Sequence, residues 1–104
     1  MELNLNNKTA LITGSSKGIG KAIAESMAEE GCNLILTARS EDKLITVKSD
    51  LQKKYNISVE IIAIDLSLKG AAEKVAEFSG NVDILINNAG AIPPGNILDI
   101  NEDI

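Results

Sequence analysis

The chain has 104 residues, which is enough for one small domain. Its 15 acidic and 10 basic side chains give a net charge of −5, and only 2% of its residues are aromatic, so it lacks the basic surface and stacking aromatics of a nucleic-acid-binding protein. No apolar run reaches the roughly 18 residues of a membrane-spanning helix, and one cysteine without histidine excludes an internal disulfide, a histidine metal site and histidine acid–base chemistry.

The first predicted elements are a buried strand and a helix. Residues 9–13 form a short apolar run that Gly14 closes, as in a buried strand. Residues 18–30 have helical spacing, and Gly31 is a suitable stop just after the helix. The apolar positions that give this spacing are Ile19, Ala22, Ile23 and Met27.

A second strand and helix follow in the same order. Residues 34–38 are a continuous apolar run, preceded by Cys32, which we expect to be a small core residue. Ser40 is a suitable N-cap for the next helix, with acidic residues in its first turn. The face of this helix predicted to pack on the core consists of Leu44, Val47, Leu51 and Tyr55.

The pattern then repeats once more and ends on a strand. Residues 59–64 predict a third strand, Ser67 is a candidate cap for a third helix, and residues 84–86 predict a fourth strand. The expected core face of the third helix is Leu68, Ala71, Ala72, Val75 and Phe78, and Gly80-Asn81 ends it. Apolar strands that alternate with helices predict a parallel sheet covered on both faces, in an open α/β fold.

The last residues of the chain predict the start of a further helix. A stiff loop at residues 91–95 is followed by Asn101 and two acids, which is typical of a helix start. Because the chain stops at Ile104, we expect it to be truncated.

A glycine-rich loop joins the first strand to the first helix. Its residues are Thr13-Gly14-Ser15-Ser16-Lys17-Gly18-Ile19-Gly20. Gly14 permits a tight turn, Gly18 lets the backbone approach a diphosphate, and Gly20 lets the helix pack close to the sheet, while the helix N-terminus attracts the anion. A phosphate-binding P-loop does not fit, because five residues instead of four separate Gly14 from Gly20 and no Ser or Thr follows Lys21. The alternative is a strand–helix turn without a ligand.

The spacing of these glycines resembles that of the short-chain dehydrogenase/reductase family, whose motif is T-G-x-x-x-G-x-G. Asn87-Asn88-Ala89-Gly90 at the end of the fourth predicted strand resembles the family's second signature. The resemblance covers essentially the whole chain. It implies a Rossmann-type doubly wound parallel sheet of order 3-2-1-4, so that residues 1–104 form a single dinucleotide-binding domain, incomplete after the fourth strand.

The resemblance also implies which residues bind the cofactor. They comprise the loop residues Gly14, Ser15, Ser16, Lys17, Gly18, Ile19 and Gly20, then Arg39, Ser40, Asp65 and Leu66, and finally Asn88, Ala89 and Gly90. Asp65 stands where the family places an acid near adenine, and capping of the helix near Ser67 is its alternative role. Asn87 is expected to bond backbone across the sheet, and the Asn88–Gly90 backbone to line the ribose on the nicotinamide side.

The end of the second strand predicts NADP, with NAD as the alternative. Enzymes that prefer NAD hold the ribose 2′-hydroxyl with an acid near this point. In the family pattern Ala38 occupies that place, and the cations Arg39 and Lys17 suit a 2′-phosphate instead. Arg39 could alternatively be a solvated charge or stack on the adenine of either cofactor.

By resemblance, the family transfers hydride between nicotinamide and a carbonyl or alcohol, using a Tyr and Lys in a Y-x-x-x-K helix, a Ser and an Asn. This chain has no such motif: Tyr55 is its only Tyr, and Val59 stands four residues later. We therefore assign no catalytic residue and no metal ligand. Two hypotheses remain, the cofactor-binding part of an NADP-dependent oxidoreductase and a catalytically inactive nucleotide-binding or interaction module.

The remaining expectations concern location and partners. The first residues lack a basic and then apolar leader, so we expect no signal peptide and a cytoplasmic protein without membrane or nucleic-acid partners. The expected partners are a nicotinamide dinucleotide and, in the full-length form, a small carbonyl or alcohol substrate. Residues 84–86 would lie at a sheet edge, which predicts self-association unless residues 91–104 cover it.

Overall fold

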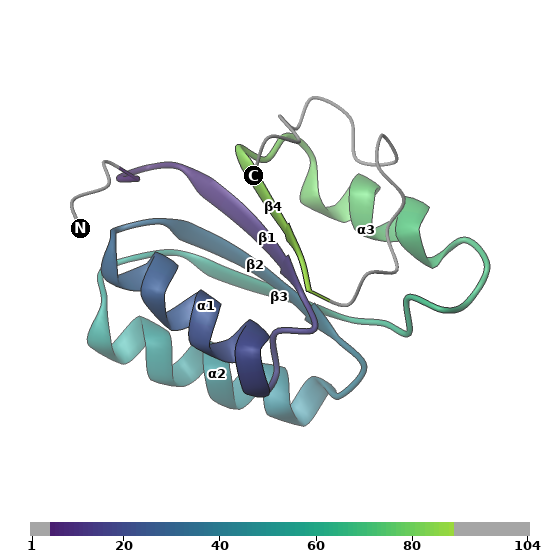
Figure 1. Cartoon of the computed structure of the whole chain (residues 1–104), viewed down its shortest axis with the longest axis horizontal. Coiled ribbons are helices and arrows are strands. Elements are labelled where there is room, and N and C mark those ends of the chain that lie inside the picture. The colour runs from purple at the N-terminus through teal and green to yellow at the C-terminus, as the bar shows by residue number, and fades with distance from the viewer. Residues whose placement is uncertain (1–4, 89–104) are drawn as a thin grey trace.

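Four parallel strands form one sheet with helices on both of its faces. The computed structural model describes residues 5–88 (Figure 1). The elements alternate along the chain as β1 (Thr9–Thr13), α1 (Gly18–Glu29), β2 (Asn33–Ala38), α2 (Glu41–Lys54), β3 (Val59–Ala63), α3 (Ala71–Ser79) and β4 (Ile84–Asn87). The strand order is β3-β2-β1-β4 and all pairings are parallel. The predicted Rossmann-type fold and its strand order are confirmed.

The core is aliphatic and lies in two layers, one on each face of the sheet. α1 and α2 cover one face, where Ile12, Leu36 and Leu44 are fully buried, and α3 covers the other, where Leu11 and Val75 are fully buried (Figure 1). Successive strand residues point to opposite faces. A sheet covered on both sides therefore needs apolar residues at successive positions, as the two central strands β1 and β2 have.

The face that α1 buries differs from the predicted one. Its buried residues are the small ones, Gly20, Ala24 and Ala28, whereas Ile19 is 72% exposed. Ile23 and Met27 pack at the flank of the core. A stripe of small residues lets the helix axis come close to the sheet, and it carries too little hydrophobicity to stand out in the sequence. The predicted stop is confirmed, because Gly31 follows the C-cap Glu30 with a φ of +85°.

The predicted start of the third helix is wrong. α3 begins at Ala71 after Gly70, which has a φ of +83°, and not near Ser67. The Asp65 carboxylate accepts hydrogen bonds from both Ser67 N (2.9 Å) and Ser67 Oγ (2.6 Å), so this hydroxyl serves a turn instead of a cap. Of the predicted core face, Leu68 is 62% exposed and Phe78 44% exposed, while the other three positions are buried.

β4 lies at one edge of the described sheet. It pairs with β1 alone, and Ile84, Leu85 and Ile86 are all partly exposed. The residues expected to cover this edge, 91–104, lie outside the described part, as does the predicted helix start at Asn101. Self-association through this edge stays a prediction. Within residues 5–88, every helix falls short of the length and apolar character needed to span a bilayer.

Cys32 is a core residue, as predicted, and its titration gives a pH test of the fold. The side chain is fully buried, and this burial raises the pKa of its thiol from the ordinary 9.0 to about 11. The native state therefore holds the proton more tightly than the unfolded state. The stabilisation is complete below pH 9 and is lost as the pH rises toward about 11.

We expect urea unfolding midpoints to fall more between pH 8 and 10.5 in the parent chain than in Cys32→Ala, which lacks the thiol. A thiol reagent at pH 8 should label Cys32 only after denaturation. Rapid labelling of the native chain, or an equal fall in both chains, would contradict this account.

Candidate functional site

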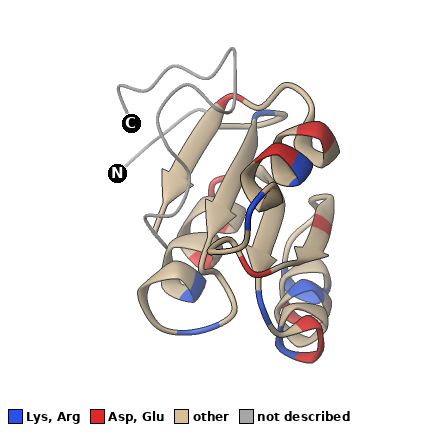
Figure 2. Cartoon of the chain, turned by 90° about the vertical axis from the view of Figure 1, so that its right-hand side faces the viewer, with Lys and Arg blue, Asp and Glu red and all other residues tan. Residues whose placement is uncertain are grey.

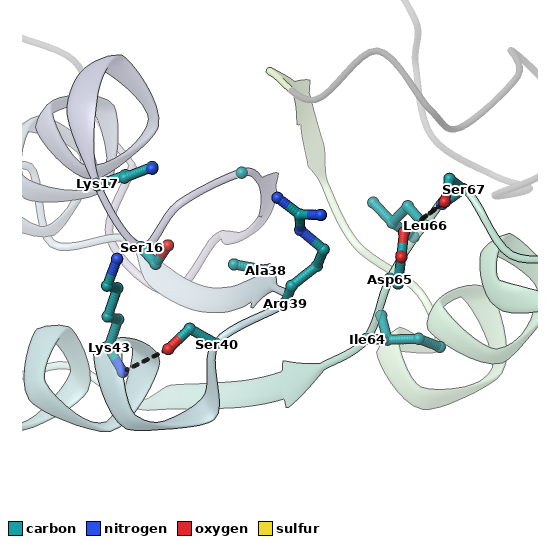
Figure 3. Close-up of a pocket in the computed structure, with 11 residues that line it drawn as sticks. Ser16, Lys17, Ala38, Arg39, Ser40, Lys43, Ile64, Asp65, Leu66 and Ser67 are labelled. Atoms are coloured by element: carbon teal, nitrogen blue, oxygen red, sulfur yellow. Dashed lines mark hydrogen bonds between the residues drawn. The ribbon is translucent and has the colours of Figure 1, made fainter.

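A cavity of about 460 Å³ opens at the carboxyl ends of β1, β2 and β3 (Figure 3). Three segments that are far apart in the sequence meet there because parallel strands all end at the same edge. The lining residues are Gly14, Ser16, Lys17, Ala38, Arg39, Ser40, Lys43, Ile64, Asp65, Leu66 and Ser67. This edge is where open α/β sheets bind ligands.

The glycines of the β1–α1 loop have the backbone conformations that their proposed roles require. Gly14 has a φ of +63° and Gly18 a φ of +60°, in the left-handed region that favours glycine. Nothing lies within 4 Å of a Cβ built on Gly18, so the approach to the start of α1 is open. A Cβ on Gly20 would overlap the Gly14 carbonyl oxygen and lie 3.0 Å from Asn88 Nδ2. The loop therefore leaves space at Gly18 and has none at Gly20.

A backbone carbonyl of β2 and two asparagine side chains at the end of β4 hold this loop in place. The backbone N–H and the hydroxyl of Ser15 both donate to the Thr37 carbonyl at 3.3 Å, and Ser15 is fully buried. Asn88 Nδ2 donates to the Gly14 carbonyl at 3.2 Å. Thr13 Oγ1 donates to Asn87 Oδ1 at 3.2 Å, which ties β1 to β4 below the loop. Ser15 and Asn88 thus shape the turn from opposite sides.

One side of the cavity carries three cations and no carboxylate. Lys17 belongs to the glycine loop, Arg39 follows the last residue of β2, and Lys43 lies in the first turn of α2 (Figure 3). Ser40 caps α2, as predicted, because its Oγ accepts a hydrogen bond from Lys43 N at 3.4 Å. Ala38, the last residue of β2, adds no charge between Arg39 and the loop. This side of the cavity is suited to an anion.

The opposite side combines a carboxylate with apolar side chains. Hydrogen bonds from Ser67, with a smaller contribution from the nearby Arg39 charge, keep the pKa of Asp65 below its ordinary value. Asp65 is therefore ionised at neutral pH and can only accept hydrogen bonds. Leu66 and Ile64 lie beside it in the lining. A flat apolar ring with an amino group, such as adenine, fits this combination.

The structure brings most predicted site residues together but not all of them. Gly14, Ser16, Lys17, Arg39, Ser40, Asp65 and Leu66 line the cavity. Ser15 is the fully buried residue of the loop, and Gly18, Ile19 and Gly20 begin α1 beside the cavity. Asn88 contacts the loop through Gly14, and Ala89 and Gly90 lie outside the described residues.

The sequence reasoning missed Lys43, Ile64 and Ser67 as lining residues. For Lys43 a signal existed, because a residue three positions after an N-cap lies in the first helical turn, next to the cap.

Charges of both signs occur at this end of the molecule. Figure 2 shows blue and red segments together in the loops and helix ends beyond the strand tips. The net charge of −5 therefore does not describe the local field, which the cations of the cavity and the helix N-termini determine. Among residues 5–88, no group of three His, Cys, Asp or Glu side chains is placed to hold a metal ion.

Comparison with known proteins identifies the family. The sequence model of the short chain dehydrogenases matches residues 8–104. The chain belongs to the short-chain dehydrogenase family. An uncharacterised oxidoreductase of Bacillus subtilis is 41% identical over 104 residues, which cover 99% of this chain and 39% of that protein. The chain thus spans well under half the length of this relative in the short-chain dehydrogenase family.

Solved structures agree with this assignment. L-sorbose reductase from Gluconobacter frateurii, complexed with NADPH and L-sorbose, has 40% sequence identity and a TM-score of 0.82, covering 86% of this chain and 36% of that one. A 3-oxoacyl (acyl-carrier-protein) reductase from Agrobacterium tumefaciens, with NADP bound, has 34% identity and a TM-score of 0.76, covering 89% and 40%. Both resemble most of this member of the short-chain dehydrogenase family.

Proposed function

We propose that this chain is a single dinucleotide-binding domain, the NADP(H)-binding part of a short-chain oxidoreductase that transfers hydride between nicotinamide and a carbonyl or alcohol substrate. The observation that carries the proposal is the cavity at the end of β2, where Lys17, Arg39 and Lys43 surround a position occupied by Ala38. A carboxylate at that position would bind the ribose 2′-hydroxyl of NAD, and cations there suit the 2′-phosphate of NADP. Similar structures that hold NADPH or NADP support the choice.

Each part of the site has a task in this proposal. The N–H groups at the start of α1 and the open space at Gly18 receive the diphosphate. Asp65 accepts a hydrogen bond from the adenine amino group, and Leu66 contacts the ring. Lys17, Arg39 and Ser40 bind the 2′-phosphate. A bound nicotinamide would supply or accept the hydride, and the Asn88–Gly90 segment would line its ribose.

Replacement of Arg39 by alanine tests the choice of cofactor. We expect Arg39→Ala to weaken NADPH binding by roughly 1–3 kcal/mol, the range of a charge-assisted hydrogen bond, and to leave NADH binding nearly unchanged. Calorimetric titration of the full chain with both cofactors measures this difference. Lys53→Ala, an exposed lysine at the far end of α2, is the control and should change neither affinity.

Two results would contradict the proposal in different ways. An equal loss of affinity for both cofactors would show that Arg39 stacks on the adenine. A chain that binds NADH at least as tightly as NADPH would contradict NADP as the cofactor.

The position of Tyr55 favours a second candidate, a catalytically inactive nucleotide-binding module. Tyr55 is the only Tyr of the sequence and follows the last residue of α2, about 21 Å of helix away from Ser40. It donates a hydrogen bond to Glu25 at 2.9 Å, which raises the pKa of Tyr55. A proton donor at a substrate carbonyl needs a lowered pKa and a place at the cavity, and Tyr55 has neither.

Sequencing the gene beyond the codon for residue 104 separates the two candidates. An in-frame continuation that carries a Y-x-x-x-K motif favours the oxidoreductase, and a stop codon favours the inactive module. Both candidates predict that these 104 residues bind NADPH without consuming it in the presence of small ketones and aldehydes. Turnover by a preparation whose mass is 11.0 kDa would contradict both.

A further inference from the structure

Lys43 lies in the first turn of α2 and faces the same cavity as the glycine loop. Its backbone N–H donates to Ser40 Oγ at 3.4 Å, so the helix cap determines where the side chain begins. The side chain lines the cavity together with Ser16 and Arg39. Figure 3 shows it extending from α2 along the cavity toward Ser16 and Lys17. The cap thus directs an ammonium group from α2 toward the loop after β1.

The cations of the cavity form no salt bridge with the described residues of the protein. Within residues 5–88 the ion pair that the structure shows joins Lys54, at the end of α2, to Glu25 of α1. Lys17, Arg39 and Lys43 take part in no ion pair with these residues. Asp65 is the carboxylate in the lining, and Ser67 already donates two hydrogen bonds to it. Three cations from three different segments therefore face one cavity without a salt bridge, and Asp65 is near enough to feel the charge of Arg39.

A phosphate monoester matches this arrangement in charge. It carries about −1.5 to −2 charges at pH 7 and has three oxygens that accept hydrogen bonds. Two neighbouring cations balance such a group in bulk water, but here the ionised Asp65 repels it from across the cavity. A third cation offsets that repulsion, and the N-terminus of α2 adds partial positive charge on the same side.

We propose that Lys43 is a specificity-determining residue, the third cation that binds the 2′-phosphate of NADP(H) together with Lys17 and Arg39. This inference rests on the proposed function, since it concerns the same cavity. Lys43 contacts the phosphate directly and has no contact with the parts that NADP and NAD share. Its removal therefore lowers the preference for NADP without lowering affinity for the dinucleotide as such.

Lys43→Gln in the full chain tests this role. Glutamine keeps the length and the helix propensity of the side chain, and it leaves the backbone N–H that donates to Ser40. Because Lys43 is exposed, water screens its charge, and we expect NADPH binding to weaken roughly three- to tenfold with NADH binding unchanged within about twofold. The NADPH effect should shrink in 1 M salt, where the Debye length is about 3 Å.

The control variants separate this role from a structural one. Lys48→Gln removes a lysine from the same helix outside the cavity, so both affinities should be unchanged. Lys43→Arg keeps the cation and should retain the preference for NADPH. Urea midpoints of all three variants should match that of the parent chain.

The outcomes distinguish the inference from the proposal beneath it. A selective loss of NADPH affinity in Lys43→Gln supports the inference. Equal losses for both cofactors, or a parent chain that prefers NADPH while Lys43→Gln retains the full preference, overturn the role of Lys43 alone. A parent chain that binds neither dinucleotide overturns the proposed function as well.

Discussion

Gly20→Ala is expected to destabilise the protein by about 2–3 kcal/mol, as overpacked sites commonly do. The new Cβ would overlap the Gly14 carbonyl oxygen and approach Asn88 Nδ2 to 3.0 Å. In an ordinary helix this substitution is favourable by about 1 kcal/mol, because alanine is the better helix former. The close approach of α1 to the loop reverses the sign. Urea denaturation followed by circular dichroism measures the change.

The variant should also lose dinucleotide affinity by at least roughly tenfold, since a displaced Gly14 breaks the hydrogen bond from Asn88 and misaligns the loop. Gly80→Ala is the matched control. Gly80 has a φ of +63° and a ψ of −138° but nothing within 4 Å of its Cβ position, so that variant bears backbone strain of about 1–3 kcal/mol and should bind normally. A Gly20→Ala protein as stable as the parent would contradict the close packing at the loop.

Ala38→Asp should reverse the cofactor preference. Ala38 is half-buried at the end of β2 and lines the cavity between Arg39 and the glycine loop. In the proposed function a carboxylate there would face the 2′-phosphate, and such a like-charge contact costs several kcal/mol, so NADPH affinity should fall by roughly a hundredfold or more. The same carboxylate can accept a hydrogen bond from the 2′-hydroxyl of NADH, whose affinity should rise. Titration of both cofactors gives the ratio.

Ala38→Asn controls for size in this experiment. It adds a side chain of the same shape without charge, so it should weaken NADPH binding far less than Asp does. Equal effects of Asn and Asp would mean that volume, not charge, governs this position. An Asp variant that still prefers NADPH would place the 2′-phosphate elsewhere.

Local patterns were sufficient to predict the elements whose signals are local. The four strands are mostly apolar runs, with the exposed Glu60 as the charged exception in β3. Ser40 and Gly31 mark helix ends by their own side-chain or backbone properties. The strand order is a different matter. Nothing in a short apolar run says which strand becomes its neighbour, and the order came from the resemblance of the glycine motifs.

The predictions from sequence were wrong or incomplete where two local interactions compete, or where tertiary packing decides which residues are buried. At Ser67 the hydroxyl that could have capped a helix donates to the Asp65 carboxylate instead, and the N-cap of α3 is Gly70, three residues later. In α1 the buried residues are small, and only the three-dimensional approach of helix and loop shows why Gly20 is among them. Lys43 was missed because its place in the cavity depends on how α2 leaves the end of β2.

The hydrogen bonds from the end of β1 to Asn87 and Asn88 indicate when the binding site forms as the chain folds. Thr13 and Gly14 are held by Asn87 and Asn88, and each of these hydrogen bonds spans 74 positions of sequence. During synthesis the glycine motif leaves the ribosome early. Asn88, whose side chain donates a hydrogen bond to the Gly14 carbonyl, leaves it last among the described residues. Pairings over such separations form late, because the intervening chain must first be ordered. Dinucleotide affinity should therefore report completion of the sheet, and a bound dinucleotide would favour molecules in which the final strand has docked.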